Sequence, residues 1–191
     1  YDSFYFAGDD IVYALIKNAM LLDEDSAFRK ELKDLSFAEY RQNIKNFFGK
    51  DYNGQTVADR VLRKNFNIQY SIPLMCYFLE LLKRGCKDCN VRYVDVFADC
   101  PPNASVISEF KEKLGIDITR LTWRFERDAI CTIVRKEIEP LLKKVATIMY
   151  SYACDVVLLS GRPSSLPVIR DIFLKYYVVS PNRLITLNDY Y

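Results

Sequence analysis

The polar turn at residues 160–165 contains the residue types that can receive a polar ligand. It reads Ser-Gly-Arg-Pro-Ser-Ser and lies between an apolar run, Val156–Leu159, and a helix-like pattern that begins near Pro167. The first amides of a helix have no partner within the helix, and the positive end of the helix dipole lies at the same place. The start of a helix therefore attracts a nucleotide or another polar ligand.

Single residues of this turn have two interpretations each, and the sequence leaves both open. Gly161 either lets a ligand approach the backbone closely or only permits a tight turn. Arg162 is either a contact to the adenine or ribose of a nucleotide or an arginine exposed to solvent or held in a salt bridge. Ser164 and Ser165 either bind the ligand or cap the next helix, with Pro167 in its first turn.

A second group of candidate residues, Gly8, Asp9 and Asp10, lies near the start of the sequence. Apolar residues recur after it at helical spacing from Ile11 onward, which predicts an amphipathic helix that opens with two acids. The two carboxylates either help to order the magnesium ion of a nucleotide through water or only interact favourably with the helix dipole.

The cysteine spacing raises the possibility of a metal site. Cys86-Lys-Asp-Cys89 is followed by Cys100, but no fourth cysteine or histidine lies close behind it. A structural zinc site normally has four ligands. A zinc-stabilised domain is therefore one interpretation, and free, reduced thiols are the other. Because the chain contains no histidine, neither a Ser-His-Asp nor a Cys-His catalytic arrangement can form within it.

Composition limits the classes of partner. The 191 residues carry 27 basic and 25 acidic side chains, for a net charge of +2. The two signs are interspersed, so we expect no nucleic-acid-binding surface. No apolar run approaches the length of a membrane span, so we expect no membrane segment. The sequence opens at Tyr1 and stops after a strand-like run, and we expect it to be a piece of a longer cytoplasmic protein.

Hydrophobic periodicity predicts an α/β chain with a helix-rich N-terminal part and a β-α-β C-terminal part. Residues 21–35 are predicted to be a loop or a short helix, and the last unit a right-handed parallel crossover. The predicted helices span residues 9–22, 36–49, 55–64, 68–83, 105–114 and 128–150, and one more helix is predicted after Ser164. The predicted strands span residues 90–97, 121–125, 156–159 and 183–187.

Several of these segments resemble a known superfamily. Gly8-Asp9-Asp10 resembles the Gly-Gly-Glu-Asp segment of actin-like and Hsp70-like ATPases, and Arg135–Lys143 is similar to the long helix that leads to their adenosine motif. Residues 156–167 resemble that adenosine motif itself. The segments Ala7–Ile11, Cys154–Pro167 and Pro181–Leu187 most resemble the SrfB family of bacterial virulence factors. This second resemblance, like the first, implies an actin-like ATPase.

The resemblance implies a fragment of an actin-like ATPase fold. Residues 1–120 would form a helix-rich overhang lobe with a small strand element, and residues 121–191 the long helix and the β-α-β part of the second core lobe, unless the whole is one continuous domain. It further implies binding of ATP and Mg²⁺ in the bacterial cytoplasm, with this chain supplying the adenosine side of the cleft. The residues implied in nucleotide binding are Gly8, Asp9, Asp10, Ser160, Gly161, Arg162, Ser164 and Ser165.

The same resemblance limits what the chain does alone. Hsp70-like proteins place an arginine just before the Ile-Pro pair, to stack on adenine, whereas Ser165 stands there and Arg162 is the candidate to stack in its stead. The superfamily's phosphate-binding glycine turns and catalytic acids are absent, so no residue here is expected to be catalytic. The partners implied are a nucleotide and the remainder of the parent chain. The alternative is a non-catalytic protein-interaction module that keeps the fold but has lost nucleotide binding.

Overall fold

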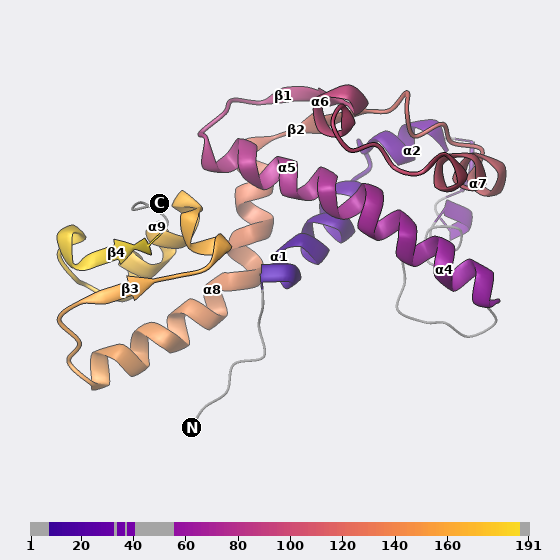
Figure 1. Cartoon of the computed structure of the whole chain (residues 1–191). Helices are drawn as coiled ribbons and strands as arrows, with labels where there is room; N and C mark the ends of the chain where they lie inside the picture. The colour runs from indigo at the N-terminus through magenta and orange to yellow at the C-terminus, as the bar shows by residue number, and fades with distance from the viewer. Residues whose placement is uncertain (1–7, 33, 37, 41–55, 188–191) are drawn as a thin grey trace. The chain divides into compact units, whose positions relative to one another are not determined.

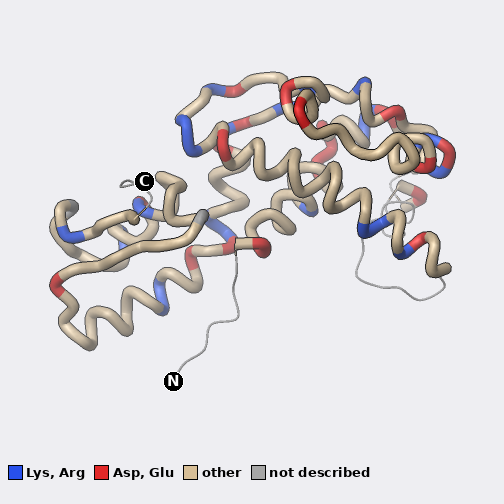
Figure 2. The backbone as a smooth tube through the Cα atoms, in the orientation of Figure 1, with Lys and Arg blue, Asp and Glu red and all other residues tan. Residues whose placement is uncertain are grey.

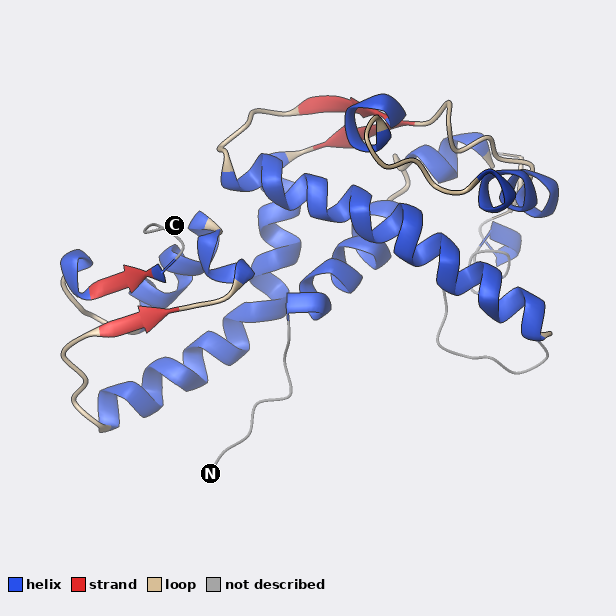
Figure 3. Ribbon diagram, in the orientation of Figure 1, coloured by secondary structure: helices blue, strands red, loops and turns tan. Residues whose placement is uncertain are grey.

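The computed structural model describes residues 8–32, 34–36, 38–40 and 56–187, without the side chains of residues 162 and 181 (Figure 1). These residues form a mixed α/β structure that is mostly helical, with two small sheets (Figure 3). The chain divides into two compact units, which interleave along the sequence. Unit 1 comprises residues 1–15, 79–86 and 127–191, and unit 2 comprises residues 16–78 and 87–126.

Unit 1 is organised around one long helix, α8, which packs against α1 and α9. Its buried residues recur every four positions and so form a single stripe; they are Ile130, Val134, Ile138, Leu142 and Ala146. Pro140 lies within this helix on its exposed side. The elements of unit 1 besides the end of α5 are α1 (Gly8–Leu15), α8 (Arg127–Ser151), β3 (Val157–Leu159), the 3₁₀ turn η3 (Arg162–Ser165), α9 (Pro167–Tyr176), the 3₁₀ turn η4 (Pro181–Arg183) and β4 (Leu184–Thr186).

The sheet of unit 1 confirms the predicted β-α-β order. Strands β3 and β4 are parallel, with Val157 opposite Leu184 and Leu159 opposite Thr186. Two contacts join the segments next to this sheet: the Arg183 guanidinium lies 3.2 Å from the Asp155 carboxylate, and the hydroxyl of Tyr177 donates a hydrogen bond to the Cys154 carbonyl. The crossover helix α9 therefore returns the chain beside the strand it left.

Unit 2 contains a nearly unbroken helical run from α4 through α5, interrupted only by a wider π-helical segment. Thr56 begins it with a capping box, in which the Thr56 hydroxyl and the Asp59 carboxylate satisfy each other's backbone amides. The elements are the π-helix η1 (Ile16–Leu21), α2 (Ala27–Glu31), α4 (Val57–Phe66), the π-helix η2 (Asn67–Ser71), α5 (Ile72–Lys83, to Phe78 in this unit), β1 (Cys89–Arg92), α6 (Tyr93–Phe97), α7 (Ala104–Leu114) and β2 (Thr122–Phe125).

Aromatic side chains fill the core of unit 2. The rings of Phe66 and Phe110 stack at 4.2 Å, and Phe28 meets Trp123 edge-on at 5.0 Å. The indole Nε1 of Trp123 donates a hydrogen bond of 2.9 Å to the hydroxyl of Tyr70. This bond satisfies the one polar atom of the buried indole, so the tryptophan is buried without leaving a donor unpaired.

The predicted strand at residues 90–97 is wrong over its second half. Residues 90–92 pair antiparallel with β2 as part of β1, but residues 93–97 form the short helix α6. The Asp95 carboxylate accepts hydrogen bonds from the backbone amide and the guanidinium of Arg92, which fixes a helical turn at that point. Phe97 is then buried against Tyr70, at 5.0 Å between ring centroids. A local cap and a tertiary contact thus outweigh the alternating pattern.

The predicted elements around residues 21–49 have mixed outcomes. Residues 21–35 contain the short helix α2, capped by the Ser26 hydroxyl, as the second of the two predicted possibilities. Ser36, the first residue of the predicted helix at residues 36–49, forms a capping box with Glu39 through reciprocal hydrogen bonds. The predicted end of that helix at Gly49 lies outside the described residues.

Candidate functional site

The turn after β3 follows the strand at once, as predicted, but it takes an extra step before the next helix. Ser160 and Gly161 are exposed, and residues 162–165 then form the 3₁₀ turn η3 before α9 begins at Pro167. Pro167 is the first residue of α9, where its missing N–H costs nothing. The predicted strand–turn–helix junction is therefore present, with a short helical turn inserted in it.

Gly161 has a backbone conformation that requires glycine. Its φ of 90° and ψ of 161° lie in a region that is essentially closed to residues with a side chain. Among the described atoms outside its chain neighbours, a Cβ atom built on Gly161 would meet only Cδ of Pro163, at 3.9 Å. Gly161 therefore permits a tight turn, the second of its two predicted roles. The side of the backbone where a side chain would project is open, so a ligand has room to approach it.

The two serines of the turn do not cap α9. The Ser164 hydroxyl instead donates a 2.7 Å hydrogen bond to the Gly161 carbonyl, and the Ser164 amide donates to the same oxygen at 3.1 Å. The N-cap of α9 is Leu166, without a side-chain hydrogen bond. The hydrogen bonds of Ser164 therefore close η3, and its side chain is only 7% exposed. Ser165 is half-buried.

The structure brings the two predicted ligand segments together. A Cβ atom built on Gly8, the first residue of α1, would lie 3.2 Å from Cγ and 3.6 Å from Cδ of Pro163. Few real Cβ contacts are as close, so the glycine allows the start of α1 to approach the turn after β3. Because α1 packs on α8 and α8 packs on α9, the long helix holds both segments in place.

The remaining predicted residues flank this approach. Asp9 and Asp10 are exposed in the first turn of α1, next to Gly8. The backbone of Arg162 begins η3, whereas its side chain lies outside the described part of the structure. The chemistry available is therefore an open glycine backbone, exposed Ser160 and two carboxylates that can attract a hydrated cation.

Sequence reasoning missed the residues that fix α9 against α8. The Glu139 carboxylate on α8 accepts hydrogen bonds from Nζ of Lys175 at 2.7 Å and from the hydroxyl of Tyr176 at 2.6 Å. Lys175 and then Tyr176 hold the pKa of Glu139 below its usual value, and Glu139 raises the pKa of Lys175. These groups lie far apart in sequence, and only their helical positions could have suggested a pairing.

The cysteine candidates do not assemble into a metal site in the part of the chain that is described. No group of three or more Cys, Asp or Glu side chains there is placed to hold a metal ion. Cys89 and Cys100 are exposed and Cys86 is half-buried, and none of the three forms a disulfide with a described residue. The described helices also include none that is long and apolar enough to cross a bilayer.

Comparison with known proteins gives one match. The whole sequence, residues 1–191, matches the family described as Virulence factor SrfB. No curated protein and no solved structure matches the chain significantly. The match covers the three segments whose resemblance to this family was noted above, together with the region between them. The chain therefore belongs to the SrfB virulence factor family.

Proposed function

We propose that the chain binds the adenosine part of a nucleotide at the turn after β3, and that Asp9 and Asp10 help to order the Mg²⁺ of that nucleotide through water. The observation that carries this proposal is the close approach of Gly8 to Pro163. Two segments that are distant in sequence resemble nucleotide-binding motifs, and they meet on one side of unit 1.

The residues present fit such a ligand. The exposed backbone of Gly161 can lie against an uncharged ring or ribose, and the adjacent carboxylates favour a metal-bound phosphate over a bare one, because they repel an uncompensated anion. In this proposal Gly161 and Ser160 contact the nucleoside, and Arg162 stacks on its base. Gly8 permits the close approach of α1, and Ser164 and Ser165 shape the turn.

We further propose that the fold is a fragment of the actin-like ATPase fold, in which unit 1 contributes the β-α-β element of the adenosine motif. The parallel β3–α9–β4 order and the family match support it. The glycine-rich phosphate turns of that superfamily have no counterpart in these 191 residues. We therefore expect the chain to bind a nucleotide without hydrolysing it, in a virulence-associated protein of the bacterial cytoplasm.

Binding is tested by titrating a fluorescent ATP analogue with the purified chain in the presence of Mg²⁺. We expect saturation with a Kd of about 1 mM or tighter, and competition by ATP and by adenosine. Gly161→Val should weaken binding at least about tenfold, or ~1.4 kcal/mol, because the new side chain would occupy the open side of the turn. Arg162→Ala, which leaves the turn backbone intact, should also weaken it.

Gly115→Val is the matched control for Gly161→Val. Gly115 ends α7 with a φ of 71° and has no atom within 4 Å of a built Cβ, so the substitution strains a positive-φ turn in unit 2 without touching the proposed site. Circular dichroism shows whether each variant folds. Unchanged affinity in both Gly161→Val and Arg162→Ala, or no binding by the unaltered chain, would reject the proposal.

A second function, a protein-interaction module without nucleotide binding, is favoured by one observation. Two apolar side chains of unit 1 are exposed, Leu158 of β3 at 61% and Val178, just after α9, at 98%. Exposed apolar surface commonly marks an interaction site. This function predicts that the ATP analogue does not bind, whereas Leu158→Ser and Val178→Ser lower the affinity for a protein partner without lowering thermal stability.

A further inference from the structure

The second half of α8 presents a surface that is both basic and aromatic. Lys143 and Lys144 are exposed there, and Tyr150 and Tyr152, which follow them in sequence, are 80% and 78% exposed. Lys143 and Tyr150 lie seven positions apart, a spacing that places them on one side of the helix. Tyr152 follows the last residue of α8.

An apolar side chain of another loop lies at the same end of unit 1. Val178, just after α9, is 98% exposed. Its neighbour Tyr177 donates a hydrogen bond to the Cys154 carbonyl, which joins the loop after α9 to the loop after α8. Figure 1 shows the end of α8 and the starts of β3 and β4 at this one end of unit 1. We call the five exposed residues Lys143, Lys144, Tyr150, Tyr152 and Val178 the α8 end surface.

The charge of the α8 end surface has one sign. Neither Lys143 nor Lys144 forms an ion pair with a described residue. Residues 140–154 contain no acid, and Figure 2 shows no acidic position along the second half of α8. The two lysines are therefore free to interact with an anionic partner.

The acids nearest in sequence do not neutralise these lysines. The Glu139 carboxylate lies 2.7 Å from Nζ of Lys175, and the Asp155 carboxylate lies 3.2 Å from the guanidinium of Arg183. Glu137, the next acid toward the start of α8, is half-buried. Since Glu139 and Asp155 each have a cation of their own, the α8 end surface has a net positive charge.

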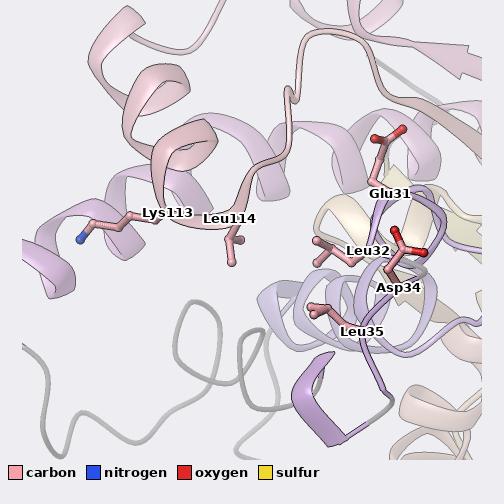
Figure 4. Close-up of a pocket in the computed structure, with 6 residues that line it drawn as sticks. All are labelled: Glu31, Leu32, Asp34, Leu35, Lys113 and Leu114. Atoms are coloured by element: carbon pink, nitrogen blue, oxygen red, sulfur yellow. The ribbon is translucent and has the colours of Figure 1, made fainter.

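A pocket of unit 2 shows no such preference for one sign of charge. It is lined by Glu31, Leu32, Asp34, Leu35, Lys113 and Leu114. Figure 4 shows the carboxylates of Glu31 and Asp34 on one side of it and the amine of Lys113 on the other. Because both signs are present, the charges of the pocket favour neither an anionic nor a cationic partner.

The exposure of the α8 end surface indicates the shape of its partner. Three of its side chains, Tyr150, Tyr152 and Val178, are 78–98% exposed. Side chains that are so exposed project from the protein and do not line a groove. A broad, flat partner can contact all of them, whereas a narrow protein segment has no groove to occupy.

We propose that the α8 end surface binds the anionic surface of a phospholipid bilayer. The long side chains of Lys143 and Lys144 reach the anionic headgroups. The rings of Tyr150 and Tyr152 enter the headgroup layer, where a ring that is apolar with one polar end is favoured. This inference goes beyond nucleotide binding and does not depend on it.

The number of charges sets the strength of this binding. One lysine near an anionic bilayer raises the affinity about fivefold. Two lysines should therefore favour an anionic bilayer over an uncharged one by about 30-fold. Binding by so few groups is weak and reversible.

Co-sedimentation of the purified chain with lipid vesicles tests the inference. The chain should bind vesicles of phosphatidylcholine and phosphatidylserine in equal parts about 30-fold more tightly than vesicles of phosphatidylcholine alone. About 0.5 M salt should remove this difference, because it screens the charges. The double variant K143E/K144E should bind both kinds of vesicle equally poorly. Y150S/Y152S should bind both kinds more weakly than the unaltered chain but should keep the preference for phosphatidylserine.

The matched control is K17E/K87E, which reverses two exposed lysines of unit 2 and changes the net charge by the same amount as K143E/K144E. It should bind vesicles like the unaltered chain, and circular dichroism shows whether every variant folds. Labelled polyglutamate is the probe for an acidic protein partner. Equal binding to both kinds of vesicle, unchanged binding by K143E/K144E, or binding of polyglutamate through these lysines without binding of vesicles would each overturn the inference.

Discussion

A methyl group placed on Gly8 would press against the ring of Pro163, with its carbon 3.2 Å from Cγ. This contact joins the first turn of α1 to the turn that follows β3. It makes position 8 intolerant of side chains for a reason that lies in another part of the sequence. The contact also gives a direct test of how closely the two segments approach.

Gly8→Val should lower the free energy of unfolding by about 1–2 kcal/mol, because the added side chain overpacks the contact with Pro163. In a Pro163→Ala background the same substitution should cost less, since the ring carbons that it meets are gone. Urea unfolding of the four variants of this double-mutant cycle gives the coupling. Equal costs in both backgrounds would show that the two residues do not meet.

Asp9→Asn/Asp10→Asn should remove the dependence of nucleotide affinity on Mg²⁺. It should also lower stability by about 0.3–1 kcal/mol for each charge lost, since acids at a helix start interact with the dipole. The binding titration is repeated with Mg²⁺ and with a chelator. Asp128→Asn, in the first turn of α8, is the control for the dipole alone, and it should leave the effect of Mg²⁺ intact. If the double variant behaves as this control does, the carboxylates serve only the helix.

Asp59→Asn should destabilise the chain near neutral pH and lose this effect in acid. The ion pair with Lys113 and the hydrogen bonds from Thr56 lower the pKa of Asp59 to about 2, from an ordinary value of 3.8. A depressed pKa in the folded state stabilises the protein above the unfolded pKa, and this stabilisation is lost as the pH falls from 3.8 toward about 2.

Urea midpoints measured at pH 7 and again below pH 3 test this prediction. The difference between the unaltered chain and Asp59→Asn should be largest at pH 7 and should shrink in acid. Asp34→Asn, an exposed acid without an ion pair among the described residues, should show little difference at either pH. A difference that is the same at both pH values would contradict the role assigned to the ion pair.

Ala153→Gly should stabilise the chain by about 0.5–1 kcal/mol. Ala153 follows the end of α8 with a φ of 49°, a left-handed conformation that costs less for glycine than for alanine. Thermal unfolding measures the change. Ala129→Gly, within the first turns of α8, is the control and should destabilise by a similar amount, because glycine loses more entropy in a helix. A lower melting temperature for Ala153→Gly would be the contrary result.

Local signals in the sequence predicted much of the fold where one residue determines the backbone. Gly115 ends α7 in the left-handed conformation, as expected of a glycine stop. The capping box of Ser36 and Glu39 and the long apolar stripe of α8 can also be recognised in the sequence. Each of these features depends on residues within a few positions of one another, so the pattern alone carries the information.

The errors arose where a contact that the hydrophobic pattern does not reveal decides the structure. Residues 93–97 alternate like a strand, but the cap from Asp95 and the packing of Phe97 on Tyr70 make them helical. Ser164 looked like a cap for α9, yet its hydroxyl is bound to the Gly161 carbonyl. Nothing near Gly8 in the sequence points to Pro163, so the candidate residues could be named but their meeting could not be predicted.

The sheet of unit 1 has a consequence for how its loop is held. Strands β3 and β4 have three residues each, so few hydrogen bonds hold them in register. The ion pair between Asp155 and Arg183 and the contact of α9 with Glu139 help to keep the two strands aligned. Loss of the contact between Glu139 and α9 would increase the motion of the Gly161 backbone while the two strands stay folded. The exchange rate of the amide protons in the turn after β3 should therefore depend on how firmly α9 packs on α8. A substitution at Glu139 should raise that rate although Glu139 does not lie in the turn.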